Sequence, residues 1–258
     1  MEKRQNVVVT GASGGIGRAI ALVLGAAGCH VLLASRNVDG LEETARQVRD
    51  GGGTADVFAV DVSEEESIDR FAADLRARDV EVHALVNNSG IAGPSKPLWE
   101  VEPTQWDETM DVNLRGVYLC CRAFVPQMIS RGTGAVVNVG SVAGKNPLVH
   151  RSPYAASKAG LIGLTKTLAT DAGPFGVRVN LVSPGAVGGE RLDWVAAARS
   201  RATGVPEEEV RAAAARDAAL KRFTEASEVA EAVRFLVSQE SSGITGIDLT
   251  VAAGYVMN

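Results

Sequence analysis

Seven short apolar segments alternate with segments that have the residue spacing of amphipathic helices, and this alternation constrains the fold strongly. Parallel strands need a long crossover between them, usually a helix, so the pattern predicts a parallel sheet. The predicted strands are residues 5–10, 29–35, 54–60, 82–88, 134–140, 177–183 and 247–252. The predicted helices are residues 15–27, 38–50, 64–78, 103–131, 153–173 and 225–238. We therefore expect an α/β fold, a doubly wound sheet of about seven strands with helices on both faces.

The length and composition fit one folded unit over residues 1–258. With 46% hydrophobic and 22% charged residues, the chain can bury a full core, and α/β domains of this size are commonly undivided. The stretch between Pro184 and Glu225 is rich in Ala, Arg and Glu and departs from the alternation. We expect it to form a small helical substrate lid near residues 186–222.

The charge balance argues against polyanionic partners. A net charge of -5 provides no basic footprint for nucleic acid, and no charge run suggests a membrane surface. No segment is long and apolar enough to predict a membrane span, so we expect a cytoplasmic protein. The three cysteines, Cys29, Cys120 and Cys121, lack the spacing of metal ligands, and we expect no metal.

The first predicted strand runs into a glycine-rich turn that opens a helix. The turn is Thr10-Gly11-Ala12-Ser13-Gly14-Gly15-Ile16-Gly17. Glycines let the backbone turn tightly and approach a pyrophosphate, whose charge is favoured at a helix N-terminus. A lone glycine-rich turn is often only a loop, but a strand before it and a helix after it are the context of a dinucleotide site. The predicted sheet is therefore of the Rossmann type.

The end of the second strand favours NADP(H) over NAD(H). An NAD enzyme places an acid there, about 20 residues beyond the glycine turn, to hold the ribose hydroxyls. This chain has Ser35 and Arg36 instead, and a guanidinium suits a 2′-phosphate. The alternative is that Arg36 is only a surface arginine. Gly14 weakens the case for NADP(H), because many NADP enzymes carry a basic residue in the glycine-rich turn.

Polar residues also follow the third and fourth strands, where ligands gather in such folds. Asp61 and Val62 end the third strand and are placed to hold the adenine, although Asp61 equally suits a helix cap. Asn88 and Gly90, within Asn87-Asn88-Ser89-Gly90, end the fourth strand. They lie beside the cofactor or form an ordinary turn.

Tyr154 and Lys158 are four residues apart in a predicted helix and therefore share one face. A free tyrosine has a pKa of about 10, but a neighbouring cation favours the phenolate and makes the side chain usable near neutral pH. Such a pair alone is usually structural, an exposed aromatic beside a lysine. The dinucleotide-type turn changes that expectation to an acid/base pair.

Over nearly its whole length the chain resembles the short-chain dehydrogenase/reductase family. The resemblance rests on Thr10-Gly11-x-x-x-Gly15-x-Gly17, Asn87-Asn88-Ser89-Gly90, Asn113, Ser141 with Tyr154 and Lys158, and Pro184-Gly185, in this order. It implies a nicotinamide-dependent oxidoreductase with a catalytic set of Asn113, Ser141, Tyr154 and Lys158. Tyr154 transfers the proton, Ser141 binds the reacting oxygen, Lys158 assists Tyr154 and holds the ribose, and Asn113 holds a relay water.

The expected cofactor contacts combine these motifs with the strand ends. They are Gly11, Ser13, Gly15, Ile16, Gly17, Ser35, Arg36, Asp61, Val62, Asn88, Gly90, Tyr154, Lys158, Pro184, Gly185 and Val187. One departure concerns Gly189, near where many family members carry a threonine that helps hold the nicotinamide. We expect backbone groups, notably around Val187, or a lid residue to provide that contact. Ser89, where the family usually has alanine, is a small change.

The substrate is less constrained than the reaction. The end of the chain, Ile244-Thr245-Gly246 onwards, is similar to 3-oxoacyl carrier-protein reductases, but many polyol and alcohol dehydrogenases share it. The candidates are a ketone, an oxoacyl thioester or a polyol. Arg191 supports an anionic or polyoxygenated substrate. His150 and Arg151 can pair with an acidic substrate group, but polar residues in a loop are more often simply solvated, and that is what we expect of them.

Two further expectations concern alternatives and assembly. The alternatives are an NAD-dependent alcohol or polyol dehydrogenase, another reaction on the same scaffold, or a non-catalytic NADP(H) sensor. The family resemblance implies a homotetramer or homodimer that pairs through the helices near 103–131 and 153–173. Small residues along the second helix allow close approach, though they equally suit packing inside the chain.

Overall fold

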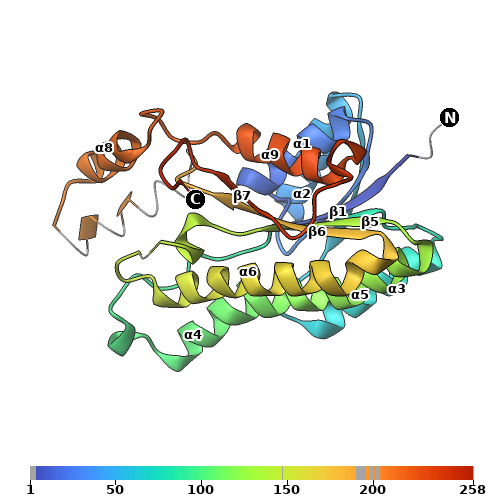
Figure 1. Ribbon diagram of the computed structural model, residues 1–258, viewed down its shortest axis with the longest axis horizontal. Coiled ribbons are helices and arrows are strands. Elements are labelled where there is room, and N and C mark those ends of the chain that lie inside the picture. The colour runs from blue at the N-terminus through green and yellow to red at the C-terminus, as the bar shows by residue number, and fades with distance from the viewer. Residues whose placement is uncertain (1–3, 147, 190–195, 198–199, 202–203, 258) are drawn as a thin grey trace.

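The computed structural model describes residues 4–146, 148–189, 196–197, 200–201 and 204–257. Seven parallel strands form one sheet in the order β3-β2-β1-β4-β5-β6-β7 (Figure 1). The strands are β1 (Asn6–Thr10), β2 (His30–Ser35), β3 (Thr54–Ala59), β4 (Ala84–Asn87), β5 (Gly134–Val139), β6 (Val177–Pro184) and β7 (Asp248–Val251). Each lies within the predicted segment or extends one residue beyond it, and the predicted α/β class is confirmed.

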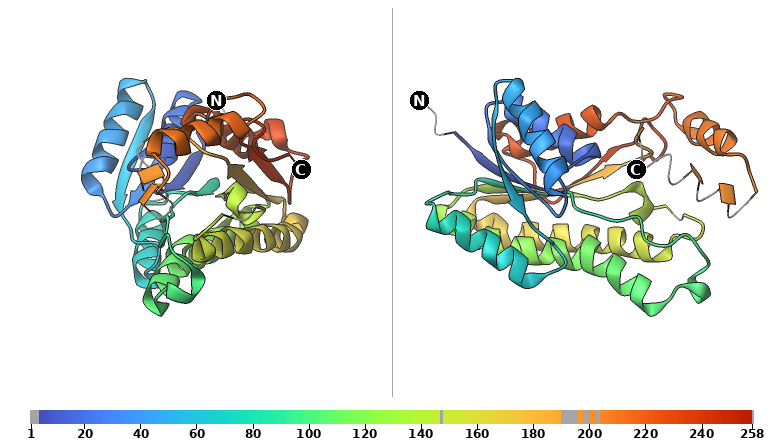
Figure 2. Two further views of the ribbon diagram at one scale, coloured as in Figure 1. Left: turned by 90° about the vertical axis from the view of Figure 1, so that its left-hand side faces the viewer. Right: turned by 180° about the vertical axis from the view of Figure 1, so that it is seen from behind.

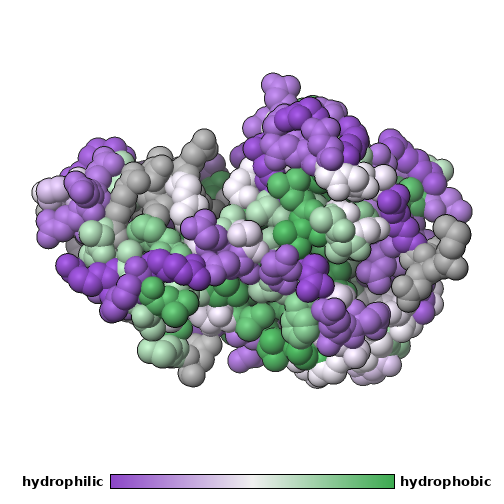
Figure 3. Space-filling view, turned by 90° about the horizontal axis from the view of Figure 1, so that it is seen from above, coloured by the Kyte–Doolittle hydropathy of each residue, from purple (hydrophilic) through white to green (hydrophobic). Residues whose placement is uncertain are grey.

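Helices cover both faces of the sheet. One layer contains α1 (Gly15–Ala26), α2 (Val38–Asp50) and α9 (Ala226–Val237). The other contains α3 (Glu65–Ala77), α4 (Pro103–Met110), α5 (Gly116–Arg131) and α6 (Ser152–Ala172) (Figures 1 and 2). Seen from above, hydrophobic side chains appear near the middle of the first layer among hydrophilic ones (Figure 3).

The core explains why these residues form strands and helices. Val7, Val8 and Val9 are fully buried, because consecutive side chains of a central parallel strand enter opposite layers. Val8 joins the hydrophobic cluster under α3, α5 and α6. Val7 and Val9 join the cluster under α1, α2 and α9. The sheet is therefore held between two cores.

The strand order brings the first and fourth strands side by side at the centre of the sheet. β1 pairs with β2 on one side and β4 on the other, so the chain winds outward in opposite directions from this point. Open α/β sheets bind ligands at the carboxyl ends of the strands near such a reversal.

The predicted helix over residues 103–131 is interrupted. Between α4 and α5 the backbone forms a π-helical turn, η2 (Asp111–Arg115). Insertions of this kind are frequent at functional sites, and here the turn contains Asn113. Helical periodicity does not reveal the interruption, because α4, η2 and α5 follow one another without a break in the helical backbone.

The predicted lid is described only in part. Helix α8 (Glu207–Asp217) lies at one end of the molecule, beyond the carboxyl ends of the strands (Figure 1). Arg191, which the sequence suggests as a substrate contact, lies outside the described residues. No helix in the described part of the chain has the length and apolar character of a membrane span.

Candidate active site

A cleft of about 1220 Å³ lies at the carboxyl ends of the strands. One end is lined by the glycine turn and by residues that follow β2 and β3. The other end is lined by Ser141, Tyr154 and Lys158. The predicted cofactor residues therefore line the same cavity as Ser141, Tyr154 and Lys158, whereas Asn113 is buried and is not among the residues that line it.

Two glycines of the turn, Gly11 and Gly17, are packed so tightly that side chains would not fit there. A Cβ atom on Gly17 would lie 2.1 Å from the Gly11 carbonyl oxygen and 2.5 Å from Asn88 Nδ2. Gly11 has a φ of +66°, and its own Cβ would lie 2.9 Å from the Ser89 backbone. The close approach of helix α1 to the turn leaves helix N–H groups at the cleft, as an anion site requires.

Asn88 connects the glycine turn to the end of β4. Its Nδ2 donates to the carbonyl oxygens of Thr10, at 3.0 Å, and Gly11, at 3.1 Å. The Thr10 hydroxyl in turn accepts from the backbone N–H groups of Asn88 and Ser89, both at 3.0 Å. The Asn88 side chain thus holds the turn in shape from within the protein.

Ser35, Arg36 and Asp61 lie together where β2 and β3 end. Ser35 is buried and donates to the Asn37 carbonyl oxygen at 3.3 Å. The Arg36 side chain is 63% exposed, and its Nη1 lies 3.5 Å from Asp61 Oδ2. Partial burial works to raise the pKa of Asp61, but hydrogen bonds from Ser63 and the nearby Arg36 outweigh it and lower that pKa.

The cleft is positively charged, although the whole chain carries a net charge of -5. Among the described lining residues, Arg18, Arg36, Arg151 and Lys158 are cationic, and Asp61 is the only carboxylate. Arg18 was missed in the sequence. It donates to the Ser13 carbonyl oxygen at 2.7 Å and so supports the glycine turn. Such a charge distribution favours an anionic ligand.

Tyr154 and Lys158 lie one turn apart on α6, as predicted. Tyr154 is half-buried, and Lys158 is only 4% exposed. Lys158 Nζ donates to the Val139 carbonyl oxygen at 2.9 Å and lies 5.8 Å from the centre of the Tyr154 ring. The lysine is therefore fixed between β5 and the tyrosine.

Ser141 begins a short 3₁₀ turn, η3 (Val142–Gly144), directly after β5. Its Oγ accepts the N–H of Ala143 at 3.1 Å, which leaves the serine O–H as a donor. Gly144 presses this turn against α6, because a Cβ there would lie 2.8 Å from the carbonyl carbon of Lys158. The contact sets the position of Ser141 relative to the Tyr154 helix.

Asn113 is fully buried in the π-helical turn. Its Oδ1 accepts the Ile91 N–H at 2.8 Å, while Nδ2 donates to the Ile91 carbonyl oxygen at 3.0 Å and Ser157 Oγ at 3.1 Å. A Cβ added to Gly90 would lie 3.2 Å from Asn113 Oδ1 and 3.5 Å from Lys158 Nζ. Asn113 and Lys158 thus both lie close to Gly90.

The segment after β6 also lines the cleft. A Cβ on Gly185 would lie 2.8 Å from that of Ala252, so Pro184-Gly185 packs on the end of β7. Val187 forms an isolated parallel bridge with Thr224. In such a bridge the neighbouring peptides make the hydrogen bonds, so the N–H and C=O of Val187 point away from Thr224.

Two residues near Tyr154 differ from the sequence expectation. Arg151 was expected to be solvated, yet it is only 7% exposed, and its guanidinium carbon lies 5.2 Å from the centre of the Tyr154 ring. Burial against an aromatic ring on the next helical turn has no signature in a single sequence. Tyr255, near the C-terminus, also lines the cleft and was not anticipated.

The described residues contain no group of three or more His, Cys, Asp or Glu side chains placed to hold a metal ion. The cysteines are buried. Burial raises the pKa of Cys121 to about 12 and works against thiolate chemistry.

Comparison with known proteins identifies the family. The model of a family described as enoyl-(acyl carrier protein) reductase matches residues 11–256. A curated relative, cis-4-hydroxycyclohexanecarboxylate dehydrogenase of Sinomonas cyclohexanicum, is 37% identical over 252 residues, which cover 96% of this chain and 95% of the relative.

Two solved structures share the fold along nearly the full chain. A variant of actinorhodin polyketide ketoreductase with NADPH has a TM-score of 0.93 and 33% identity, covering 98% of this chain and 97% of that one. NAD+-bound xylitol dehydrogenase has a TM-score of 0.91 and 30% identity, covering 98% and 100%. The protein is a member of the short-chain dehydrogenase/reductase family of oxidoreductases.

Proposed function

We propose that this protein is an NADP(H)-dependent oxidoreductase that interconverts a carbonyl compound and a secondary alcohol, with Tyr154 as the acid/base. One observation carries the proposal: Tyr154 and Lys158 lie in the same cleft as the tightly packed glycine turn at the start of α1. The tyrosine therefore faces the space that a dinucleotide would share with its substrate.

The residues at the cleft fit a dinucleotide. The cradle around Gly11 and Gly17 is too tight for side chains, and four of the five charged residues in the described lining are cationic. The glycine turn would hold the pyrophosphate, and Lys158 would hold the nicotinamide ribose. When bound, the nicotinamide supplies or accepts the hydride.

The side chains at the other end of the cleft supply the proton and stabilise charge. In reduction, negative charge develops on the carbonyl oxygen, and Tyr154 donates a proton to it while the Ser141 O–H donates a hydrogen bond. Lys158 stabilises the resulting phenolate by its charge. Asn113 lies beside Lys158, where a relay water is proposed to return a proton.

Arg36 is the proposed basis of the preference for NADP(H). Its exposed guanidinium at the end of β2 is placed to bind a 2′-phosphate. The ion pair between Arg36 and Asp61 is long, at 3.5 Å, and therefore weak enough for a phosphate to replace the carboxylate. We expect Arg36→Ala to weaken NADPH binding by about tenfold or more and to change NADH binding little. Titration of nicotinamide fluorescence measures both affinities.

The control for this experiment is Arg70→Ala, an exposed arginine on α3 outside the cleft. Equal loss of NADPH and NADH affinity in Arg36→Ala would contradict the assignment. So would an NADH preference in the unsubstituted protein. That result would favour the second candidate, an NAD-dependent alcohol or polyol dehydrogenase, in which Arg36 remains paired with Asp61.

The proposed substrate is a ketone, an oxoacyl thioester or a polyol. Support comes from the relatives named for a cyclohexanecarboxylate alcohol, a polyketide ketone and xylitol. A panel of these classes, followed by nicotinamide absorbance, tests the reaction. Tight cofactor binding without turnover of any class would favour a sensing role. A cytoplasmic location and a homotetramer or homodimer remain predictions.

A further inference from the structure

Arg151 is a buried cation at the start of helix α6. Its side chain is only 7% exposed, and the residue occupies the N-cap position of the helix. Burial removes the hydration of a guanidinium, and a helix N-terminus carries partial positive charge, so both features make this an unfavourable place for a cation. A specific interaction is needed to offset that cost.

The Tyr154 ring provides such an interaction. The Arg151 guanidinium carbon lies 5.2 Å from the ring centre, and Lys158 Nζ lies 5.8 Å from the same point. Both distances are within the range of about 6 Å at which a cation is attracted to an aromatic ring. The attraction grows when the ring carries the negative charge of a phenolate.

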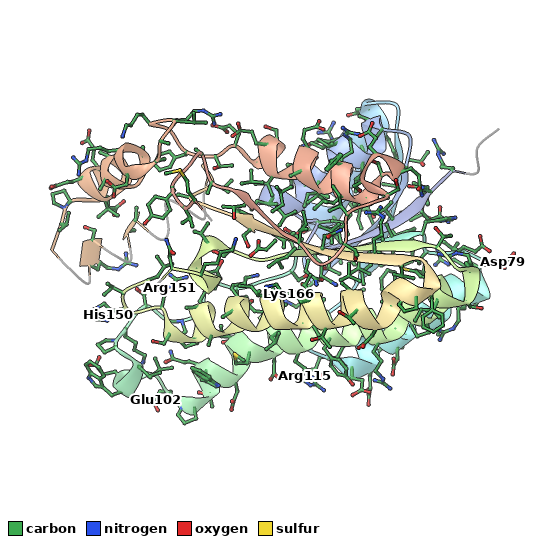
Figure 4. The ribbon with its side chains drawn as sticks, viewed as in Figure 1. Asp79, Glu102, Arg115, His150, Arg151 and Lys166 are labelled. Atoms are coloured by element: carbon green, nitrogen blue, oxygen red, sulfur yellow. The ribbon has the colours of Figure 1, made fainter. Side chains whose placement is uncertain are left out.

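Hydrogen bonds fix Arg151 in this position. Its Nη2 donates to the Ala92 carbonyl oxygen at 2.7 Å, which joins the start of α6 to the segment after β4. The Lys96 N–H donates to the His150 carbonyl oxygen at 3.0 Å and strengthens the same connection. Figure 4 shows Arg151 and His150 side by side at the end of α6 that faces the α8 end of the molecule.

We propose that Arg151 is a positioning residue that acts through Tyr154, stabilising its phenolate together with Lys158 so that proton abstraction continues at lower pH. The proposal rests on the role of Tyr154 as the acid/base. It explains why a cation is buried where the helix and a second cation both disfavour it. Removing the charge should make the phenolate harder to form.

Other titratable groups near Tyr154 must be considered. Among the described lining residues these are Lys158 on α6, His150 before α6 and Tyr255 from the C-terminal segment. Asp61, the described carboxylate of the cleft, lies at the end of β3 beside Arg36. The described surroundings of the tyrosine therefore supply cations and neutral groups, which favour the phenolate.

Titration of phenolate absorbance tests the proposal without turnover. The chain has three tyrosines, and Tyr118 and Tyr255 are 49% and 37% exposed. Tyr154→Phe identifies the Tyr154 step by its loss. We expect Arg151→Gln to move that step up by about one pH unit. Glutamine retains an N–H donor for Ala92, so the variant separates lost charge from a lost hydrogen bond.

The pH profile of alcohol oxidation provides a second readout. Since oxidation needs the phenolate, Arg151→Gln and Arg151→Met should lower kcat/KM by about tenfold on the acidic limb and little at high pH. Arg151→Lys should retain most of the activity on that limb. Arg70→Met, the same chemical change at an exposed site, should leave the profile unchanged.

Three results would overturn the proposal. The first is a Tyr154 step that does not move in Arg151→Gln. The second is a loss of kcat/KM that is equal at all pH values, which indicates a structural role. The third is an acidic limb that disappears in His150→Asn, which would assign the limb to the histidine. Lack of turnover with a shifted phenolate step would instead reject the proposed function and keep the Arg151 interaction.

Discussion

Single residues set the shape of the cofactor end of the cleft, and Gly17 is the most restrictive of them. It lies where α1 passes against the glycine turn, with the Gly11 carbonyl oxygen directly in the space that a Cβ would need. Gly14, three residues earlier, has an extended backbone with a φ of -176° and no atom within 4 Å of an added Cβ. Two glycines of the same turn therefore differ in whether a side chain would fit.

We expect Gly17→Ala to lose about 1–3 kcal/mol of stability and to bind NADPH weakly, because the added methyl forces the turn and α1 apart. Gly14→Ala should fold with nearly unchanged stability, since its backbone suits any residue. Urea unfolding and nicotinamide fluorescence measure the two effects. Equal behaviour of the two variants would show that tight packing does not shape the turn.

Most of the site residues were predictable because they follow apolar strands whose ends the sequence marks clearly. Asn88 and Ser141 follow β4 and β5 in this way. The position of Arg151 was not predictable, since its burial depends on the Ala92 carbonyl from a distant segment as well as on the nearby Tyr154 ring. The roles of the catalytic set stay predictions, because geometry places residues together without measuring their chemistry.

At the scale of elements, a charged cap at the start of α9 holds the segment that connects the predicted lid to α9. Arg222 makes two hydrogen bonds to the Glu228 carboxylate, at 2.8 Å and 2.6 Å. Glu228 also accepts the N–H of Glu225 in the capping box of α9. Thr224, between these residues, bridges to Val187 at the cleft wall. The cap thus anchors one side of the cleft.

This cap predicts a pH dependence of stability. The hydrogen bonds from Arg222 and then from the Glu225 N–H lower the pKa of Glu228 to about 2. Because the folded-state pKa is depressed, the stabilisation is complete above the unfolded-state value of about 4.3 and is lost as pH falls through about 2. Glu228→Gln should therefore unfold at lower urea near neutral pH, with the difference shrinking across this window.

Glu66→Gln serves as the matched control, because Glu66 is 92% exposed and its ion pair is long, at 3.7 Å. A constant difference between Glu228→Gln and the unsubstituted protein from neutral pH to about pH 2 would contradict the account.

The elements themselves were largely predictable, because buried parallel strands and amphipathic helices have distinct periods. The π-helical turn within residues 103–131 was not predictable. At this turn the Asn113 side chain forms hydrogen bonds with the Ile91 backbone, which belongs to a distant segment. Long-range contacts of this kind are absent from local sequence patterns.

At the scale of the whole molecule, helices α5 and α6 lie beside one another on one side of the sheet (Figure 2). Gly160 of α6 is used within the chain, since its Cβ would lie 2.8 Å from Leu114. Ala159 and Gly163 are exposed on the same helix, and Gly163 has no atom near an added Cβ. Part of the small-residue surface is therefore available for a second copy.

We expect the protein to sediment as a homotetramer or homodimer, and Gly163→Arg to shift it toward smaller species, because a large charged side chain blocks close helix approach. Gly173→Arg, at an exposed glycine beyond the end of α6, is the control. A monomeric mass for the unsubstituted protein would contradict the expected association.

The central claim is that Tyr154 transfers the proton in a cleft that also binds the nicotinamide cofactor. The most direct test is Tyr154→Phe, measured by NADPH fluorescence titration and by turnover of the best ketone or alcohol. We predict unchanged folding, NADPH affinity within about threefold, and a loss of kcat of at least about 100-fold. Retained turnover in Tyr154→Phe would contradict the claim.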